Sequence, residues 1–228
     1  GLELLDANTA ITFDAFSDIK HDNAYSPRYR GYHYLSAVTA LEPDGPEQAE
    51  ALDLLRSWDL HTDKDNRQAA LGVCVLLEEW LIERSKEPLP PARDTLVKCM
   101  ASVTGISGRL DPEWGEIQRH GRDGQTWAVS GGPDTLRAMY AEQLSDDDNY
   151  LTVVAGDGLY YLIEWTADGE QIIRGTHQYG SHMTDPTSEH YLDQAEAFAE
   201  ETLRAPGFRT ANRASPTRSY TVSSPVPD

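Results

Sequence analysis

The chain has 228 residues, 39% of them hydrophobic and 25% charged, a composition typical of a globular protein with a buried core. Acidic residues outnumber basic residues 38 to 19, so the formal net charge is −19. This excess repels nucleic acid and anionic lipid, and we therefore expect neither nucleic acid nor a membrane as a partner. No apolar run reaches the roughly 20 residues that cross a bilayer.

Residues 1–105 are predicted to form a helical segment. Thr12 can cap a helix whose apolar residues begin at Phe13. Pro46 suits the first position of a later helix, because the first turn of a helix leaves its N–H groups unpaired in any case. The apolar stripe of that later helix consists of Ala51, Leu54, Leu55 and Trp58.

Two more helices are expected in this segment. One follows a polar loop at 59–66, with Asp63 or Asp65 as its cap, and its apolar residues run from Ala69 to Trp80. It must end before the proline-rich stretch 88–91, and a weaker helix is predicted over 94–102.

The two cysteines, Cys74 and Cys99, form neither a metal-binding pattern nor a CxxC motif. Cys74 falls within an apolar helical pattern, which favours a buried, inert thiol. A disulfide between the two cysteines stays open as the alternative.

From Gly105 the sequence pattern changes to short apolar runs between glycine-rich turns, which predicts strands. Residues 106–228 are therefore assigned to an α+β segment. A hairpin is predicted from 114–119 and 126–129. The turn at 130–133 is expected to begin a helix that carries Leu136, Met139 and Tyr140 on one face.

The C-terminal part is predicted to contain three more strands and a helix. The runs 151–155 and 159–165 are continuously apolar, as in a sheet covered on both faces, and a third strand is expected near 171–178. A helix follows from about 188 to 204, with its inward-facing residues at Leu192, Ala195, Ala199 and Leu203. The tail is expected to add one edge strand near Tyr220.

The segment 179–194 concentrates polar side chains between a strand and a helix. Its metal-ligand types are His182, Asp185, Glu189, His190 and Asp193. Positions 190 and 193 share a helix face, yet the spacing matches no metal signature. Capping of the helix by Thr187 or Ser188 is the structural alternative.

Other possible sites are weaker. Ser181 with His177 or His182 lacks the G-x-S-x-G elbow of a serine nucleophile. The glycines at 131 and 132 suit an anion site, but neither a P-loop nor G-x-G-x-x-G is present. The acidic loop 146–148 lacks EF-hand spacing, and Asp157 is a lone carboxylate between glycines. The tryptophans are interpreted as core residues: Trp58, Trp80, Trp114, Trp127 and Trp165.

Several motifs occur in one order across nearly the whole chain and resemble those of the penicillin acylase family, whose relatives include cephalosporin, aculeacin and acyl-homoserine-lactone acylases. They are the 12–23 segment, the LLRSWD run at 54–59 with Asp65 and Asn66, the WGE run at 114–116, SGGPDTLRA at 130–138, AGD at 155–157, and YGS with SEHYLDQ within 179–194. Gly180, His182 and Glu189 depart from the last motif.

The resemblance implies an N-terminal-nucleophile hydrolase with a four-layered αββα core. Such a protein is made as a precursor, exported to the periplasm or beyond, and cut into α and β chains. The new N-terminal serine of the β chain attacks an amide, with its own α-amino group as base and an asparagine in the oxyanion hole. This chain is similar only to the C-terminal part of the β chain.

We therefore expect the nucleophile, the oxyanion asparagine and the calcium ligands upstream of Leu2. No catalytic, cofactor-binding or metal residue is assigned to this chain. The expected function is that of a C-terminal part of an amidohydrolase, inactive alone, whose substrate is an acyl amide of the β-lactam or N-acyl homoserine lactone type. Its expected partner is the rest of the acylase, in the periplasm or secreted. The alternatives are a non-catalytic interaction module and a metal-dependent site at 179–194.

Overall fold

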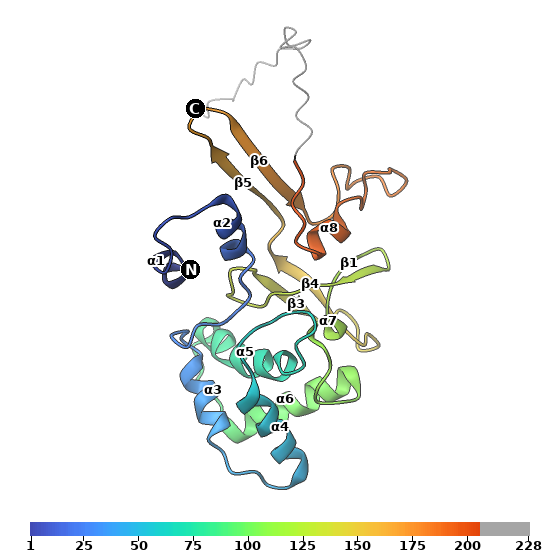
Figure 1. The fold of residues 1–228 in the computed structure, drawn as a ribbon. Coiled ribbons are helices and arrows are strands. Elements are labelled where there is room, and N and C mark those ends of the chain that lie inside the picture. The colour runs from blue at the N-terminus through green and yellow to red at the C-terminus, as the bar shows by residue number, and fades with distance from the viewer. Residues whose placement is uncertain (206–228) are drawn as a thin grey trace, which may run out of the picture.

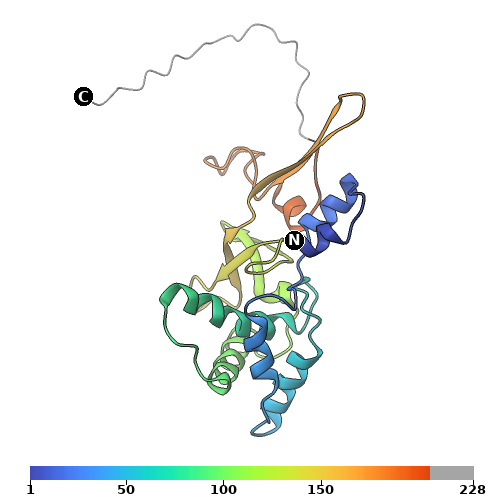
Figure 2. The same ribbon diagram turned by 90° about the vertical axis from the view of Figure 1, so that its left-hand side faces the viewer.

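The structure, a computed structural model, describes residues 1–205, without the side chains of residues 83–85. The chain forms a helical end, a central four-stranded sheet and a projecting two-stranded hairpin (Figures 1 and 2). The predicted α+β class is confirmed. The edge strand predicted near Tyr220 lies outside the described residues. Within residues 1–205, no helix is long and apolar enough to span a bilayer.

The first part of the chain is helical, as predicted. Its helices are α1 (Leu2–Asp6), α2 (Phe13–Lys20), α3 (Tyr32–Thr39), α4 (Pro46–Ser57), α5 (Ala69–Ser85) and α6 (Ala92–Ser107). The Thr12 hydroxyl caps α2 by accepting a hydrogen bond from the Ala15 N–H at 3.1 Å, and α4 begins at Pro46. Both of these boundaries were predicted from the sequence.

Two other helix boundaries differ from the prediction. Asn66, and neither Asp63 nor Asp65, caps α5, because its Oδ1 accepts the N–H groups of residues 68 and 69, each at 2.9 Å. The predicted short helix at 94–102 is the 16-residue α6, which runs through Gly105 to Ser107 and is followed by Gly108, where φ is +76°. The end of α6 needs a left-handed residue, and Gly108 supplies it without strain.

The four helices α3–α6 enclose the larger hydrophobic core. Its fully buried side chains include Val38, Leu52, Leu71 and Leu96. Trp58, which follows α4 directly, and Trp114, which begins the short helix α7 (Trp114–Ile117), complete it. A β-carbon at Gly72 of α5 would lie 2.3 Å from the Trp58 ring, so the glycine is what admits that ring against the helix.

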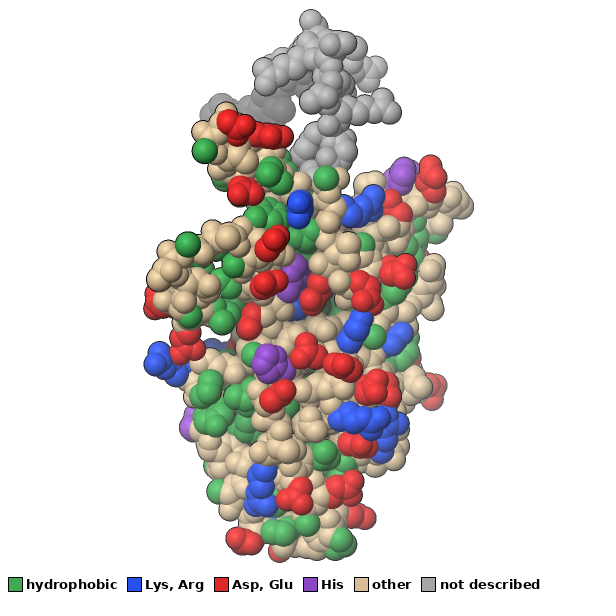
Figure 3. Space-filling view, viewed as in Figure 1, with side chains coloured by type: hydrophobic (Ala, Val, Ile, Leu, Met, Phe, Trp, Pro, Cys, Tyr) green, Lys and Arg blue, Asp and Glu red, His purple; other side chains and the backbone are tan. Residues whose placement is uncertain are grey.

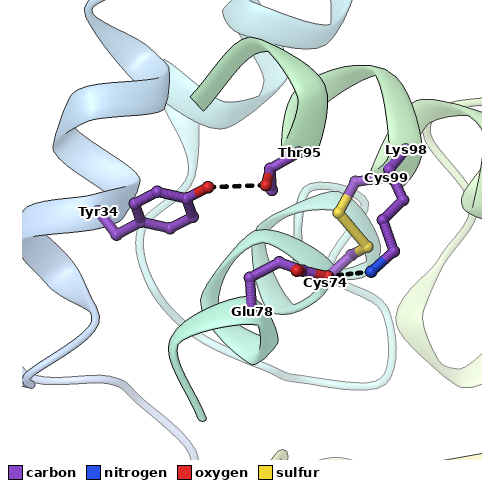
Figure 4. Close-up of a disulfide and its surroundings, with 6 residues drawn as sticks. All are labelled: Tyr34, Cys74, Glu78, Thr95, Lys98 and Cys99. Carbon is purple, nitrogen blue, oxygen red and sulfur yellow. Dashed lines mark hydrogen bonds and ion pairs between the residues drawn. A yellow bond between two sulfur atoms is a disulfide. The ribbon is translucent and has the colours of Figure 1, made fainter. Parts of the chain in front are cut away.

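Cys74 of α5 and Cys99 of α6 form a disulfide, with their Cα atoms 5.7 Å apart (Figure 4). The free thiol favoured at Cys74 by the sequence is therefore wrong, because α5 and α6 pack side by side and bring the two side chains together. Lys98 and Glu78 form an ion pair next to the disulfide, and the hydroxyls of Tyr34 and Thr95 are 2.7 Å apart.

The central sheet has the strand order β2-β1-β4-β3. Its strands are β1 (Gln118–Arg122), β2 (Gln125–Ala128), β3 (Met139–Glu142) and β4 (Leu151–Gly156). The predicted hairpin is β1–β2, and its two turn residues, Asp123 and Gly124, both have positive φ, as a tight hairpin turn requires. Residues before it differ from the prediction, because Trp114–Ile117 forms the short helix α7.

The helix expected after residues 130–133 does not form, and β3 occupies part of that range. The Thr135 hydroxyl accepts the Gly132 N–H at 3.1 Å and donates to the Arg137 carbonyl at 2.7 Å, which closes a turn instead of a helix. Met139 then pairs with Gly156 of β4. The apolar residues whose spacing predicted a helix, Leu136, Met139 and Tyr140, therefore lie in a turn and in strand β3.

The hairpin of β5 (Leu159–Trp165) and β6 (Gln171–His177) forms a separate antiparallel sheet. Both strands were predicted. The prediction that both faces of this sheet are covered is wrong for the described chain, because alternate residues of β5 are exposed. Trp165 is 65% exposed, so its assignment to the core was also wrong. The predicted helix at 188–204 is only α8 (Ala195–Ala199), since residues 181–194 form successive turns.

Candidate functional site

Distant parts of the chain meet at a polar cluster around Asp157, which we call the Asp157 junction. Its members are Lys20, His21, Arg137, Asp157, Tyr160 and Glu201. Lys20, the last residue of α2, donates to Asp157 Oδ2 at 2.5 Å and to the Leu136 carbonyl at 2.9 Å. The junction therefore ties α2 to the link between β4 and β5.

Arg137 is the centre of positive charge in the junction, and its side chain is fully buried. Its guanidinium lies 3.2 Å from Asp157 Oδ2 and 3.3 Å from Glu201 Oε1, and it donates to the Phe198 carbonyl at 2.7 Å. It also lies 4.4 Å from the centroid of the Phe198 ring. A buried guanidinium needs this number of partners, because losing its hydration is costly.

His21 lies beside these charges. Its Nε2 is 2.6 Å from the Tyr160 hydroxyl, and its Nδ1 is 3.5 Å from the Ser17 hydroxyl. Burial, followed by the nearby Arg137 and Lys20 cations, lowers the pKa of His21 to about 4. Burial also raises the pKa of Tyr160 to about 12, so both side chains are neutral near pH 7.

The Ser17–His21–Tyr160 arrangement differs from a serine-nucleophile triad. A triad places a carboxylate on the second histidine nitrogen, to orient the ring and stabilise the imidazolium. A tyrosine hydroxyl occupies that place at His21. The lowered pKa of His21 also makes it a weak base. The ion pairs of the junction therefore have a structural role: they neutralise the buried charges of segments that pack together.

The polar segment 179–194 forms a corner that is fixed to β1. The Arg122 guanidinium lies between the rings of Tyr179 and Tyr191, at 4.9 and 5.0 Å from their centroids, and Tyr191 donates to Asp123. The Gln194 N–H closes the corner by donating to the Tyr179 carbonyl at 2.8 Å. These contacts connect the end of β6 to the start of α8.

The metal-ligand residue types in this corner do not converge on one point. His190 Nδ1 is 3.2 Å from Asp193 Oδ2, whereas Asp185 accepts the hydroxyl of Thr187 at 2.6 Å. Thr187 lowers the pKa of Asp185 through this bond and its N–H. No group of three or more His, Cys, Asp or Glu side chains that could hold a metal ion exists within the described residues.

The serine considered as a nucleophile is also isolated from its proposed bases. Ser181 is exposed and makes no hydrogen bond to His177 or His182 within the described residues. His177 Nδ1 instead accepts the Tyr179 N–H at 3.1 Å, and burial lowers the pKa of His177. A β-carbon at Gly180 would lie 2.1 Å from the His190 carbonyl oxygen, which explains a glycine next to Ser181.

The glycine turn considered for anion binding uses its N–H groups internally. Gly131 donates to the Thr62 carbonyl at 2.9 Å, and Gly132 donates to Thr135 Oγ1 and the Arg137 carbonyl. No helix begins at this turn, and both N–H groups already have partners within the chain. The turn therefore does not form the anion site that was considered from the sequence. The acidic loop at 146–148 is stabilised locally, where Asp148 Oδ2 accepts the Ser145 N–H at 3.0 Å.

The Asp157 junction was missed by reasoning from the sequence, although Asp157 itself was noted as a lone carboxylate. Lys20 and Asp157 are 137 positions apart, and no local spacing pairs them. A buried arginine such as Arg137 also has no signature in a single sequence. The available signal was that residues 130–138 and 155–157 both belong to the shared family motifs.

Comparison with protein families places most of the chain in a known family. The penicillin amidase family model matches residues 1–215. A search of curated proteins gives no significant match. The match covers most of the chain, including α1–α8, β1–β6 and the Asp157 junction. The chain therefore belongs to the penicillin amidase family, a family of amide-bond hydrolases with acylase activity.

Proposed function

We propose that this chain is the C-terminal part of an acylase that hydrolyses the acyl amide bond of a β-lactam or an N-acyl homoserine lactone. The observation that carries the proposal is the family match over residues 1–215. In this proposal the nucleophile, the oxyanion asparagine and any calcium ligands lie in the remainder of the acylase polypeptide. That remainder is the chain's partner.

The polar clusters of the chain support this division of roles. The Ser17 hydroxyl, 3.5 Å from His21 Nδ1, faces a histidine whose second nitrogen contacts a tyrosine hydroxyl. Ser181, in the corner, is exposed and separate from His177. Nucleophilic attack on an amide needs a hydroxyl, a base and an oxyanion site together. We assign those groups to the partner polypeptide.

The Cys74–Cys99 disulfide supports a location in the periplasm or outside the cell. Disulfides persist in oxidising compartments and are rare where thiol reductants are abundant. We propose that the acylase is made as a precursor, exported, and cut to release its nucleophile. The disulfide would then form after export.

The proposal is tested with chromogenic phenylacetyl and fatty-acyl amides. We expect the isolated chain to release no chromophore, and we expect release when the remaining acylase polypeptide is added. Turnover by the isolated chain that a serine-directed inhibitor stops would contradict the division of roles. A remaining polypeptide without Ser, Thr or Cys at a processing junction would instead favour the non-catalytic interaction module.

A further inference from the structure

A surface groove lies between α4 and α6 at the helical end of the molecule (Figure 1). Its volume is about 710 Å³, and it is bounded by the loop before α4, the first turns of α4, and α6 with the residues that follow it. The residues that line it include Pro46, Glu47, Glu50, Val97, Met100 and Leu110. Several of these side chains are exposed, so the groove is open to water and is not an enclosed cavity.

The floor of the groove is a second apolar row on α6. The first row faces the core, where Leu96 and Cys99 are fully buried. The second row lies in the groove and consists of Val97, Met100, Ala101 and Thr104. Its spacing of i, i+3, i+4 and i+7 places it on one face of the helix, over about 10 Å. Val97 is 50% exposed, so the described part of the chain leaves this face open.

The groove also carries charged side chains, and two of them are already neutralised. A carboxylate oxygen of Asp44 lies 2.6 Å from the Arg93 guanidinium. The Arg109 guanidinium lies 2.6 Å from a carboxylate oxygen of Glu116. These two ion pairs leave little net charge at their end of the groove.

Glu47 and Glu50 are not neutralised in this way. They lie one turn apart on one face of α4, and neither forms an ion pair with a described residue. The positive end of the helix dipole accounts for Glu47 in the first turn of α4. Glu50 lies beyond that turn, where the effect has faded. An apolar row beside two uncompensated carboxylates is complementary to a partner that is both apolar and basic.

A helix fits this groove better than a small molecule does. A small-molecule pocket encloses most of the surface of its ligand, whereas this groove is open to water. An amphipathic helix needs only a groove with an apolar floor, which it contacts through its own i, i+3, i+4 and i+7 side chains. Its apolar face would lie on Val97 and Met100, and Lys or Arg on its flank would face Glu47 and Glu50.

Charge and position argue against two other occupants. A second copy of the chain would bring together two net charges of −19, and Figure 3 shows acidic side chains spread over the visible face. The remainder of an αββα acylase would complete the sheets, but the β5–β6 hairpin lies at the opposite end of the molecule from α4 and α6 (Figures 1 and 2). Both observations favour a separate protein.

We propose that the groove between α4 and α6 is a docking site for a basic amphipathic helix of a separate protein. The apolar row of α6 provides the floor, and Glu47 and Glu50 select Lys or Arg on the flank of the bound helix. This role is independent of amide hydrolysis, so it is tested without an activity assay.

The probe is a fluorescein-labelled peptide of roughly 18 residues, built from Ala, Leu and Lys, which is long enough to form a helix. Its leucines lie on one helix face and its lysines on the two flanks. We expect its fluorescence anisotropy to rise to saturation when the purified chain is added at physiological ionic strength. A scrambled peptide has the same charge but no apolar face, and it should bind about tenfold more weakly or less.

One pair of variants tests the shape of the groove. Ala101→Trp fills the floor and should weaken binding of the peptide about tenfold or more, because the new ring occupies the place of the helix. Ser102→Trp, at the next exposed position of α6 and outside the lining, is the matched control and should bind the peptide as the unchanged chain does.

A second pair tests the charge of the groove without altering its shape. Glu47→Gln/Glu50→Gln should weaken binding about fivefold, because two exposed ion pairs are lost. Asp146→Asn/Asp147→Asn removes the same charge from an exposed loop that is not part of the groove, and it should leave the affinity unchanged. An equal loss in both double variants would show that the peptide responds to the net charge of the chain.

That result would overturn the proposal, as would three others. Equal binding of the ordered and scrambled peptides would mean that no apolar face is recognised. Equal affinity of the Ala101→Trp and Ser102→Trp variants, or no saturable binding to the unchanged chain, would remove the peptide from the groove. Displacement of the peptide by the remaining acylase polypeptide, produced separately, would assign the groove to that polypeptide and not to a separate protein.

Discussion

Lys20 Nζ and Asp157 Oδ2 lie 2.5 Å apart, although the two residues are separated by 137 positions. Their side chains are only 22% and 15% exposed, so water screens the pair weakly. Asp157 also balances the fully buried Arg137. This one carboxylate therefore connects three segments: α2, the turn before β3, and the link from β4 to β5.

Asp157→Asn should destabilise the chain by about 3 kcal/mol, because it leaves the buried Arg137 and the partly buried Lys20 without their shared anion. Urea unfolding at pH 7 measures the loss. Asp147→Asn, in the exposed acidic loop, is the control and should change the free energy of unfolding by less than about 0.5 kcal/mol. An equal effect of both variants would show that the junction carries no special stability.

Reduction of the Cys74–Cys99 disulfide should lower the free energy of unfolding by about 3 kcal/mol, because the link closes a loop of 25 positions and restricts the unfolded chain. Thermal melts with and without a reductant measure the difference. The Cys74→Ala/Cys99→Ala variant should melt like the reduced chain and should not respond to reductant. A melt of the unchanged chain that reductant does not move would contradict this prediction.

Acidification should destabilise the chain through His21. Its pKa is 6.5 when exposed and about 4 in the folded chain, mainly because of burial. Between these values the unfolded state binds more protons, so stability is complete above pH 6.5 and is lost as the pH falls toward 4. Burial also lowers the pKa values of His120 and His177, which act in the same direction. Burial raises the pKa of Glu201, which acts in the opposite direction.

His21→Gln should therefore lose less stability than the unchanged chain between pH 6.5 and pH 4. Urea unfolding at a series of pH values gives the two slopes. His182→Gln, at an exposed histidine of the corner, is the matched control and should keep the slope of the unchanged chain. Identical slopes for all three proteins would remove His21 from the acid response.

Gly131→Ala should cost about 3 kcal/mol, because φ at Gly131 is +102° and a β-carbon would lie 2.2 Å from the Arg137 carbonyl oxygen. Gly105→Ala, within α6, should gain about 0.5–1 kcal/mol, because its β-carbon meets nothing within 4 Å and alanine favours a helix. Chemical denaturation of both variants tests the contrast. A destabilised Gly105→Ala variant would contradict the continuous α6.

Asn66→Ala should destabilise α5 by about 1 kcal/mol, because its Oδ1 accepts two N–H groups of the first turn. Asp65→Ala is the control for one of the two caps that the sequence suggested, and it should have a smaller effect. Denaturant unfolding compares the two. A larger loss of unfolding free energy for Asp65→Ala than for Asn66→Ala would show that Asp65 caps α5.

Local chemistry explains which elements were predictable. Thr12 caps α2 and Pro46 begins α4 because capping and proline geometry act within a few residues. The hairpin turn at Asp123 and Gly124 is local in the same sense. The chain order of the short motifs also identified the family, which the match over residues 1–215 confirmed.

Other features depended on contacts between distant residues, and a single sequence does not contain them. The apolar spacing at 136–140 suggested a helix, but the Thr135 hydrogen bonds and the pairing of Met139 with β4 made a turn and a strand. The metal-ligand residue types at 182–193 raised a metal site as an alternative, but within the described residues no group of three or more of these side chains could hold a metal ion.

The sequence by itself determined the α+β class, the starts of α2 and α4 and the family, because capping, turn chemistry and motif order are properties of neighbouring residues. Only the tertiary structure decided that Cys74 meets Cys99, that Lys20 and Arg137 share Asp157, and that alternate side chains of β5 are exposed in the described part of the chain. These depend on how whole segments pack, and the free energy of packing is spread over contacts that no short window of the chain includes.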